Sequence, residues 1–412
     1  MNTKQHSNGL FVTVFTVSRR FKRICSFDSF FRKIIVLVTG IIILLIRNGF
    51  SQSETMNLKQ RNYFGISANY AHGTILPTTD FVKGDNLLGA PMKKYDAYTL
   101  KILWQNPGYT NWQKIYRVPY YGAGFTIADF YNPEEVGYPV SAFGILGIPV
   151  LRWDKLELYS EFQFGIAANW KHYDSISNPK NLAVGGGLTV HLNLGVNAFY
   201  PITDKLDIGA GLSFIHFSNG GFERPNNGLN ICSPSVELKY HFAGRPDARS
   251  VTAPVRQQRS NDLYFMLGYG DYQLVERELD TNYFAVGGIS AIYFNRFSNA
   301  ARIGLGTDIN YWWGLNANPD GTPGPYSFEN MTVGLILQPE VIVGRLSLVS
   351  GFGIYARHRN YGNFKQTYQR LGVRFDVYKT FFAGINVRAK NFTEAEFLEF
   401  NFGYRLKWVR GE

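Results

Sequence analysis

Cysteine is scarce in this sequence, which contains only Cys25 and Cys232 among 412 residues. Cys25 lies in an N-terminal segment that we interpret as a removable leader, so the mature chain holds one cysteine and cannot form an intramolecular disulfide. The same count excludes metal sites built from pairs of cysteines. We interpret Cys232 as a small apolar packing residue and not as a nucleophile.

Spacing typical of metal-binding histidines is also missing from the mature chain, so we expect no metal site. The histidines other than His216 in this part of the sequence are His72, His172, His191, His241 and His358.

Long apolar runs are absent after residue 51. The one long run, Ile34–Ile46, follows two basic residues and has the length of a signal-peptide core, which is short for a membrane helix. Small residues stand at the positions expected before a cut after Ser51. We therefore predict that residues 1–51 are a cleaved export signal; a cut after Ser53 or an uncleaved signal anchor is the alternative.

A strong excess of one charge sign is missing once the leader is set aside. The whole chain has 42 Lys and Arg against 31 Asp and Glu, a formal net charge of +11. Residues 1–51 hold eight of the basic residues and one acid, which leaves 34 against 30, a net charge of +4. The basic balance therefore belongs mostly to the leader, and we expect no nucleic-acid partner.

Aromatic residues and glycine, in contrast, are abundant. Hydrophobic residues make up 45% of the chain, aromatic residues make up 16%, and there are 42 glycines. This mixture is too polar for a helical membrane protein and unusually aromatic for a soluble one. It is typical of a transmembrane β-barrel, whose strands alternate lipid-facing apolar residues with small or polar lumen-facing ones. A secreted soluble β-sandwich is the alternative.

Short strand-like segments, separated by turns of Gly, Pro, Asn and Asp, fill the mature chain in two sets. The first set is 61–72, 93–106, 118–131, 137–151, 155–171, 184–200, 204–218 and 229–243. The second set is 261–272, 281–296, 299–315, 328–343, 344–358, 366–379, 380–391 and 395–409. The polar segment 244–260 between them contains two prolines and has no periodicity, which indicates a linker or a long loop.

The fold class predicted from these segments is all-β, an antiparallel transmembrane β-barrel protein of about sixteen strands. We expect two eight-stranded units, and one large barrel is the alternative. The predicted domains are a leader at 1–51, a barrel unit at 52–243, a linker at 244–260 and a second barrel unit at 261–412.

The second unit resembles a worn copy of the first. Residues 144–158 resemble 334–348 in the order of their Gly, Pro and apolar residues. Where the first unit has His216 and Ser218, however, the second has Arg388 and Lys390. We therefore predict a degenerate second copy without catalytic residues.

His216 and Ser218 stand one residue apart at the end of the predicted strand 204–218. Alternate side chains of a strand point to the same face, so a base and a nucleophile meet there. The pair continues an apolar stripe that includes Ile208, Leu212 and Phe214. This parity predicts that both side chains face lipid and that a substrate approaches from the membrane.

The sequence around this pair, His216-Phe-Ser-Asn-Gly-Gly221 followed by Pro225-Asn-Asn-Gly228, resembles the signature of the outer-membrane lipid A 3-O-deacylases (PagL type) and related acyloxyacyl-hydrolase-like proteins. The resemblance implies an eight-stranded barrel with a Ser-His-Glu triad on its lipid-facing exterior, which hydrolyses an ester-linked acyl chain of lipid A without a cofactor.

By this resemblance Ser218 is the nucleophile and His216 the general base, because a serine hydroxyl is a weak nucleophile until an imidazole takes its proton. Asn219 and the backbone amides of Gly220 and Gly221 are the nearest candidates to stabilise the oxyanion. Among the basic loop residues, Arg224 is a candidate to hold phosphates or sugars of the lipid.

The third member of the triad departs from the family pattern, because Asn230 stands where the family has its acidic residue. An asparagine oxygen can accept a hydrogen bond from the His Nδ1 and fix its tautomer, but it supplies no negative charge, so we expect slower turnover. Glu237 is a possible substitute, yet its parity places it on the opposite face of the strand. Glu223 in the preceding loop is the other alternative.

These features together predict an exported esterase of the outer membrane of a Gram-negative bacterium, with lipopolysaccharide or another outer-leaflet lipid as its partner. The alternative is a non-catalytic structural or pore-forming outer-membrane barrel. The sequence makes no prediction of the oligomeric state.

Overall fold

The computed structural model describes residues 61–256, 259–273, 282–318, 320–358, 367–390 and 394–409. The predicted leader, residues 1–51, lies outside the described residues. Asn62–Glu412 forms one compact unit of the chain.

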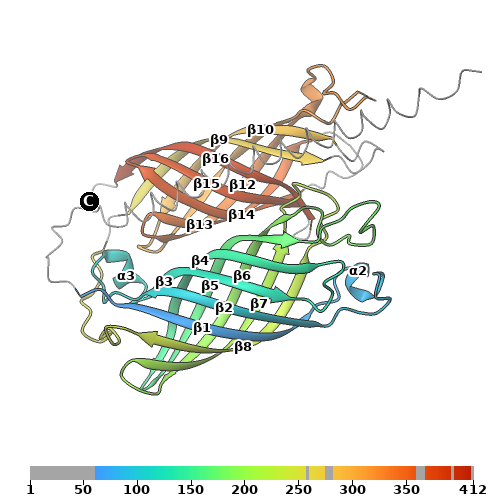
Figure 1. The fold of residues 1–412 in the computed structure, drawn as a ribbon. Coiled ribbons are helices and arrows are strands. Elements are labelled where there is room, and N and C mark those ends of the chain that lie inside the picture. The colour runs from blue at the N-terminus through green and yellow to red at the C-terminus, as the bar shows by residue number, and fades with distance from the viewer. Residues whose placement is uncertain are drawn as a thin grey trace, which may run out of the picture. The chain divides into compact units, whose positions relative to one another are not determined.

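The first half of the described chain forms one closed antiparallel barrel, in which each strand pairs with the next and β8 pairs with β1 (Figure 1). Its strands are β1 (Phe64–Ile75), β2 (Lys94–Trp104), β3 (Tyr120–Asp129), β4 (Gly137–Trp153), β5 (Leu156–Trp170), β6 (Leu188–Pro201), β7 (Leu206–Ser218) and β8 (Leu229–His241).

The second half forms another closed antiparallel barrel, in which β16 pairs with β9. Its strands are β9 (Ser260–Gln273), β10 (Tyr283–Arg296), β11 (Ala301–Trp312), β12 (Met331–Val343), β13 (Leu346–Arg357), β14 (Thr367–Tyr378), β15 (Phe381–Lys390) and β16 (Glu394–Val409). The predicted all-β fold of two eight-stranded units is therefore confirmed, and the alternative of one large barrel is wrong.

Within the described residues, three short helices lie in the connections between strands: α2 (Asp80–Lys83), α3 (Asn111–Ile115) and the 3-10 helix η1 (Phe328–Asn330). The hydroxyl of Thr79 caps α2 by accepting a hydrogen bond from the Val82 N–H at 3.3 Å. Among the described residues, no helix has both the length and the apolar character needed to cross a membrane.

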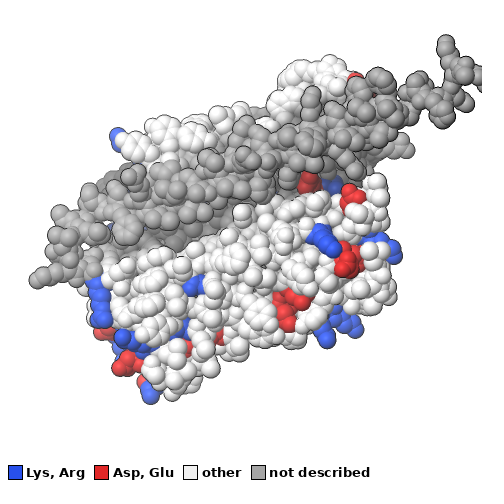
Figure 2. Space-filling view, viewed as in Figure 1, with Lys and Arg blue, Asp and Glu red and all other residues white. Residues whose placement is uncertain are grey.

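The walls of the first barrel follow the two-residue period of the sequence. In β2 the side chains of Tyr98, Leu100 and Ile102 point outward and are exposed, while the alternate residues Thr99 and Lys101 are buried in the lumen. On the face drawn in Figure 2, uncharged residues make up most of the visible surface of this barrel.

The lumen of the first barrel is filled by polar side chains that pair with one another. The Lys101 ammonium lies 3.0 Å from the Glu161 carboxylate and 2.8 Å from that of Glu237, and all three side chains are buried. The cavity beside them measures about 30 Å³, room for about one water molecule. Side chains therefore fill the lumen of this barrel around Lys101, Glu161 and Glu237.

The second barrel has a comparable lumen. Arg302 and Arg374 both pair with Glu340, at 2.6 and 2.5 Å, and Arg370 pairs with Asp308 at 3.2 Å, all of them buried. Arg388 is fully buried, with its guanidinium 3.9 Å from the centre of the Tyr368 ring.

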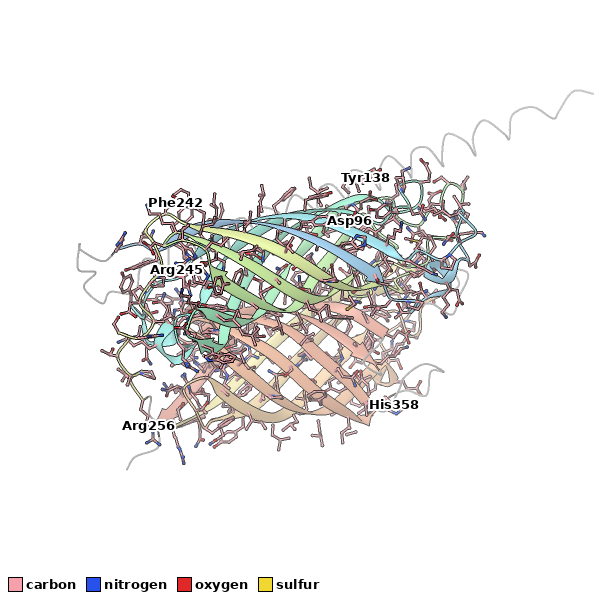
Figure 3. All side chains as sticks on the ribbon, turned by 90° about the horizontal axis from the view of Figure 1, so that it is seen from below. Asp96, Tyr138, Phe242, Arg245, Arg256 and His358 are labelled. Atoms are coloured by element: carbon pink, nitrogen blue, oxygen red, sulfur yellow. The ribbon has the colours of Figure 1, made fainter. Side chains whose placement is uncertain are left out.

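The two ends of the first barrel differ in their connections. Figure 3 places Tyr138, at the start of β4, toward one end, and Phe242 and Arg245, after β8, toward the other. The end that carries Tyr138 bears the connections 76–93, 130–136, 171–187 and 219–228. Two of the three hairpin connections at the other end, 154–155 and 202–205, are short turns.

Candidate active site

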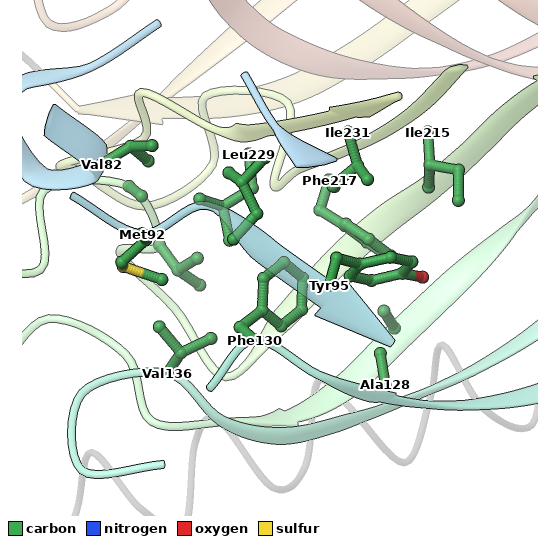
Figure 4. Close-up of a cluster of buried hydrophobic side chains, with 14 of the residues drawn as sticks. Val82, Met92, Tyr95, Ala128, Phe130, Val136, Ile215, Phe217, Leu229 and Ile231 are labelled. Carbon is green, nitrogen blue, oxygen red and sulfur yellow. The ribbon is translucent and has the colours of Figure 1, made fainter. Parts of the chain in front are cut away.

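The candidate site lies where β7 ends and β8 begins. The two strands are antiparallel neighbours, and their register pairs His216 directly with Asn230. The residues that alternate with the site residues, Ile215 and Phe217 in β7 and Leu229 in β8, are buried inside the barrel. Figure 4 shows Phe217 and Leu229 in one cluster with Phe130. The apolar core therefore anchors both strands from within and leaves the site side chains on the outside.

Three side chains form a hydrogen-bonded row on this outer face. The Nε2 atom of His216 lies 2.9 Å from the Oγ of Ser218, and its Nδ1 lies 2.7 Å from the Oδ1 of Asn230. Because an amide oxygen only accepts, Nδ1 carries the ring proton and Nε2 is left to accept the serine proton. This is the arrangement that a general base and a nucleophile require. The structure thus brings together the three residues that we predicted as catalytic.

The surface below the row is apolar. Leu212 and Phe214 continue the outward face of β7 and are 56% and 41% exposed, and Leu194 lies opposite Phe214 in β6. Val190 stands opposite Ser218 in the same register. The polar row therefore opens onto an apolar outer wall and not into the lumen, as the strand parity predicted.

The two alternative acids lie elsewhere. Glu237 is buried in the lumen, where it pairs with Lys101 at 2.8 Å, so the predicted opposite parity is confirmed. Glu223 accepts a hydrogen bond from the Tyr283 hydroxyl at 2.8 Å. Burial raises the pKa of the Glu223 carboxyl above its usual range. Neither carboxylate occupies the place next to His216 that Asn230 holds.

The predicted oxyanion residues belong to a loop that is hydrogen-bonded to itself. The Asn219 side chain donates to the Glu223 carbonyl at 2.6 Å and accepts from the Gly221 N–H at 3.0 Å. Gly220 and Gly221 have φ values of 69° and 85°, in the left-handed region that favours glycine. Asn219 and Gly221 thus brace the turn that follows the serine, and their role as oxyanion donors stays a prediction, as does that of Gly220.

Arg224 is engaged by the rim of the second barrel. Its backbone N–H donates to the Gln273 side chain at 2.8 Å, and its guanidinium lies 3.7 Å from the Glu394 carboxylate. Glu394 compensates part of the charge of Arg224. The role of Arg224 in holding a lipid headgroup stays a prediction.

Two residues of the Pro-Asn-Asn-Gly motif shape the site, although we did not predict them as site residues. The Asn226 side chain accepts a hydrogen bond from the N–H of Asn219, the residue after Ser218, at 2.9 Å. Gly228 has φ +71°, and a Cβ there would lie 3.0 Å from the Cε1 of His216. The Pro-Asn-Asn-Gly motif was the sequence signal for both Asn226 and Gly228. A glycine is required at position 228 because the backbone passes close to the His216 imidazole there.

Thr78 is a third residue that contacts the site, and no sequence motif around it indicated this. The Nδ2 of Asn230 donates to the hydroxyl of Thr78 at 3.1 Å, across 152 positions of sequence. Thr78 lies in the connection between β1 and α2, which closure of the barrel brings next to β8.

Cys232 lies on the exterior of β8, opposite Phe214, where it is exposed. Cys232 therefore lies on the outer wall beside Phe214 and not in the core. Among the residues that the structure describes, no group of three or more His, Cys, Asp or Glu side chains is placed to hold a metal ion.

The second barrel places different side chains at the corresponding positions. Arg388 and Lys390 of β15 are both buried, so they point into the lumen, whereas His216 and Ser218 point outward. The two pairs therefore differ in the face they occupy as well as in their chemistry.

Comparison with known families assigns both halves of the chain. Residues 97–239 match the model of lipid A 3-O-deacylase (PagL), and residues 260–408 match the model of the acyloxyacyl hydrolase C-terminal domain. Together the two matches cover more than two thirds of the chain. No curated protein matches the chain.

Several solved structures are similar to parts of the chain. The crystal structure of the outer membrane enzyme PagL is 18% identical, with 42% of this chain and 97% of that chain covered and a TM-score of 0.28. The corresponding values for Neisserial surface protein A are 12%, 43%, 97% and 0.28. The outer membrane protein Omp33 of Acinetobacter baumannii is 6% identical, with 84% and 99% covered and a TM-score of 0.17.

Proposed function

The chain belongs to the lipid A 3-O-deacylase (PagL) and acyloxyacyl hydrolase family, and on this premise we propose that it is an esterase of the Gram-negative outer membrane. It removes an ester-linked acyl chain from lipid A or a related glycolipid. We also propose that residues 1–51 are removed on export and that the second barrel, which corresponds to the predicted unit 261–412, is a degenerate copy without a catalytic site.

One observation carries this proposal: Ser218, His216 and Asn230 form a hydrogen-bonded row on the outer wall of the first barrel. The Ser218 Oγ attacks the acyl carbonyl carbon while the His216 Nε2 takes the hydroxyl proton. The tetrahedral intermediate collapses, the bond to the sugar oxygen breaks, and His216 returns the proton to the leaving alkoxide. Water deprotonated by the same Nε2 then attacks the acyl-enzyme, and this step releases the fatty acid and restores Ser218.

Asn230 holds His216 in the tautomer that this sequence of steps needs. Its oxygen accepts from Nδ1 at 2.7 Å, which keeps the proton off the nitrogen that faces Ser218. It gives no charge to stabilise the imidazolium that forms during the reaction, so the enzyme is slower than one with a carboxylate in this place.

The position of the row sets the direction from which the substrate arrives. Exposed apolar residues such as Leu212 and Phe214 provide a surface along which an acyl chain lies, next to the ester at Ser218. The site end of the barrel carries connections of seven or more residues each, and barrels of the outer membrane carry their longer loops on the extracellular side. We therefore place the site in the outer leaflet.

The buried ion pairs of the lumen speak against the alternative of a pore. Lys101, Glu161 and Glu237 pair across the lumen of the first barrel, and a pore would instead need a continuous water-filled lumen. This packing favours an enzyme that uses the outside of its barrel.

Mass spectrometry of lipid A from cells expressing the protein tests the proposal. The wild type should remove one acyl chain, and Ser218→Ala should leave lipid A intact. Ser213→Ala is the matched control, because Ser213 lies in the same strand and lines the lumen cavity. Identical spectra for the wild type and Ser218→Ala would refute the proposed function.

A further inference from the structure

Asn230 stands where the family has an acidic residue, and its amide group can take two orientations that differ in their hydrogen bonds, which a carboxylate cannot. The two oxygens of a carboxylate are equivalent acceptors, whereas the amide of Asn230 has an oxygen at one end and a donor nitrogen at the other. Its two ends touch two different groups, the Nδ1 of His216 at 2.7 Å and the hydroxyl of Thr78 at 3.1 Å. Two self-consistent hydrogen-bond networks are therefore available to these three side chains.

Only one of these networks supports catalysis. In the first, the amide oxygen accepts from Nδ1, and Nε2 is free to take the proton of Ser218. In the second, the amide is turned over: Thr78 donates to the amide oxygen, the amide nitrogen donates to Nδ1, and the ring proton sits on Nε2. In that state His216 donates toward Ser218 and cannot act as its base.

Thr78 is placed to favour the first network. Its hydroxyl lies 3.5 Å from the carbonyl oxygen of Leu76, an acceptor for its proton, so its own oxygen receives the N–H of Asn230. The backbone holds this geometry: the Thr78 N–H donates to the same carbonyl at 2.8 Å, and the Leu76 N–H donates to the Asn230 carbonyl at 2.8 Å. The turn that carries Thr78 is thus tied to the residue whose amide it contacts.

We propose that Thr78 is a positioning residue, which orients the Asn230 amide and through it selects the catalytic tautomer of His216. This inference rests on the proposed function for its importance, but not for its geometry. Thr78 is exposed and its side chain is outside the apolar core, so its replacement should leave the barrel folded.

A set of three single variants first tests the proposal on the full-length protein in detergent micelles, with lipid A as substrate. Thr78→Val, which keeps the shape and removes the hydroxyl, should lower kcat by about 3- to 10-fold with KM nearly unchanged, the size expected for one hydrogen bond. Thr78→Ser should restore the rate. Thr74→Val is the matched control, because Thr74 is an exposed threonine of the neighbouring strand β1, and it should have the wild-type rate.

The decisive comparison repeats Thr78→Val in the Asn230→Asp background. A carboxylate needs no orienting partner, so the loss caused by Thr78→Val should shrink to less than about 2-fold there, a coupling that a double-mutant cycle measures. An equal loss in both backgrounds, or no loss in either, would overturn the proposal.

A readout independent of activity separates this inference from the proposed function. The ring nitrogens of His216, followed by ¹⁵N NMR and assigned with His216→Gln, should show the proton on Nδ1 in the wild type and a mixture of tautomers in Thr78→Val. An unchanged tautomer in Thr78→Val would refute the role of Thr78. A wild type that shows this tautomer but hydrolyses no lipid A would instead refute the proposed function alone.

Discussion

Restoring a negative charge next to His216 should speed the reaction, and Asn230→Asp is the variant that does so with the least disturbance. Aspartate has the shape of asparagine, so the 2.7 Å contact with the His216 Nδ1 is kept and the second oxygen accepts from the Thr78 hydroxyl. Glutamate is longer by one methylene group and needs the strand or the ring to move. Aspartate therefore isolates the effect of charge.

The size of the effect follows from the distance and the surroundings. Two unit charges about 4 Å apart interact by about 1 kcal/mol in water and about 4 kcal/mol at the dielectric constant of a protein surface. The site is still partly open to solvent, so we take about 2 kcal/mol, between these two values, for the stabilisation of the imidazolium in the transition state. This corresponds to an increase in kcat of about 30-fold.

The assay is steady-state hydrolysis of lipid A by the purified protein in detergent micelles, with release of free fatty acid as the signal. We expect kcat to rise while KM stays close to that of the wild type, because the introduced carboxylate touches the base and not the substrate. Thr74→Asp, which adds the same charge to the exposed face of β1, should leave kcat unchanged. A rate for Asn230→Asp equal to or below the wild type would show that His216 does not carry the developing charge, or that its partner lies elsewhere.

Three further changes have defined outcomes. Lys101→Met removes the cation that pairs with the buried carboxylates of Glu161 and Glu237 and should destabilise the first barrel by about 3–5 kcal/mol. The measurement is the unfolding temperature, which should fall. Lys94→Met, at an exposed position of the same strand, should leave it unchanged. Glu223→Gln should keep full activity. Because burial raises the pKa of Glu223, the wild type loses stability as the pH rises from the usual pKa of a glutamate through this raised pKa, so the stability of the variant relative to the wild type should increase over that range. A variant without activity would make Glu223 the missing acid. Gly228→Ala places a Cβ 3.0 Å from the His216 ring at a residue with φ +71°, and should lower kcat about 10-fold or more; a normal rate would show that the ring tolerates displacement.

The strands were predictable because each spans ten or more residues and alternates between its two faces along much of that length. The helices α2 and α3 were missed, since four or five residues do not show a helical period. The closure into two barrels depends on pairs such as β1 with β8, which no local pattern contains.

The site also contains some residues that the sequence predicted and others that it did not. Strand parity was enough to place His216 and Ser218 on the outside and Glu237 in the lumen. Thr78 contacts Asn230, and Glu394 contacts Arg224, across long stretches of sequence. Both contacts exist only in the folded chain. Long-range neighbours of this kind leave no trace in a single sequence.

Covalent labelling with an alkyl fluorophosphonate tests the central claim most directly. An activated serine attacks the phosphorus, fluoride leaves, and the adduct stays on the nucleophile, where peptide mass spectrometry locates it. The proposed Ser218 mechanism predicts an adduct on Ser218 of the wild type, a much slower reaction in His216→Ala, and none in Ser218→Ala. An adduct on another residue, or equal labelling of the wild type and His216→Ala, would contradict it.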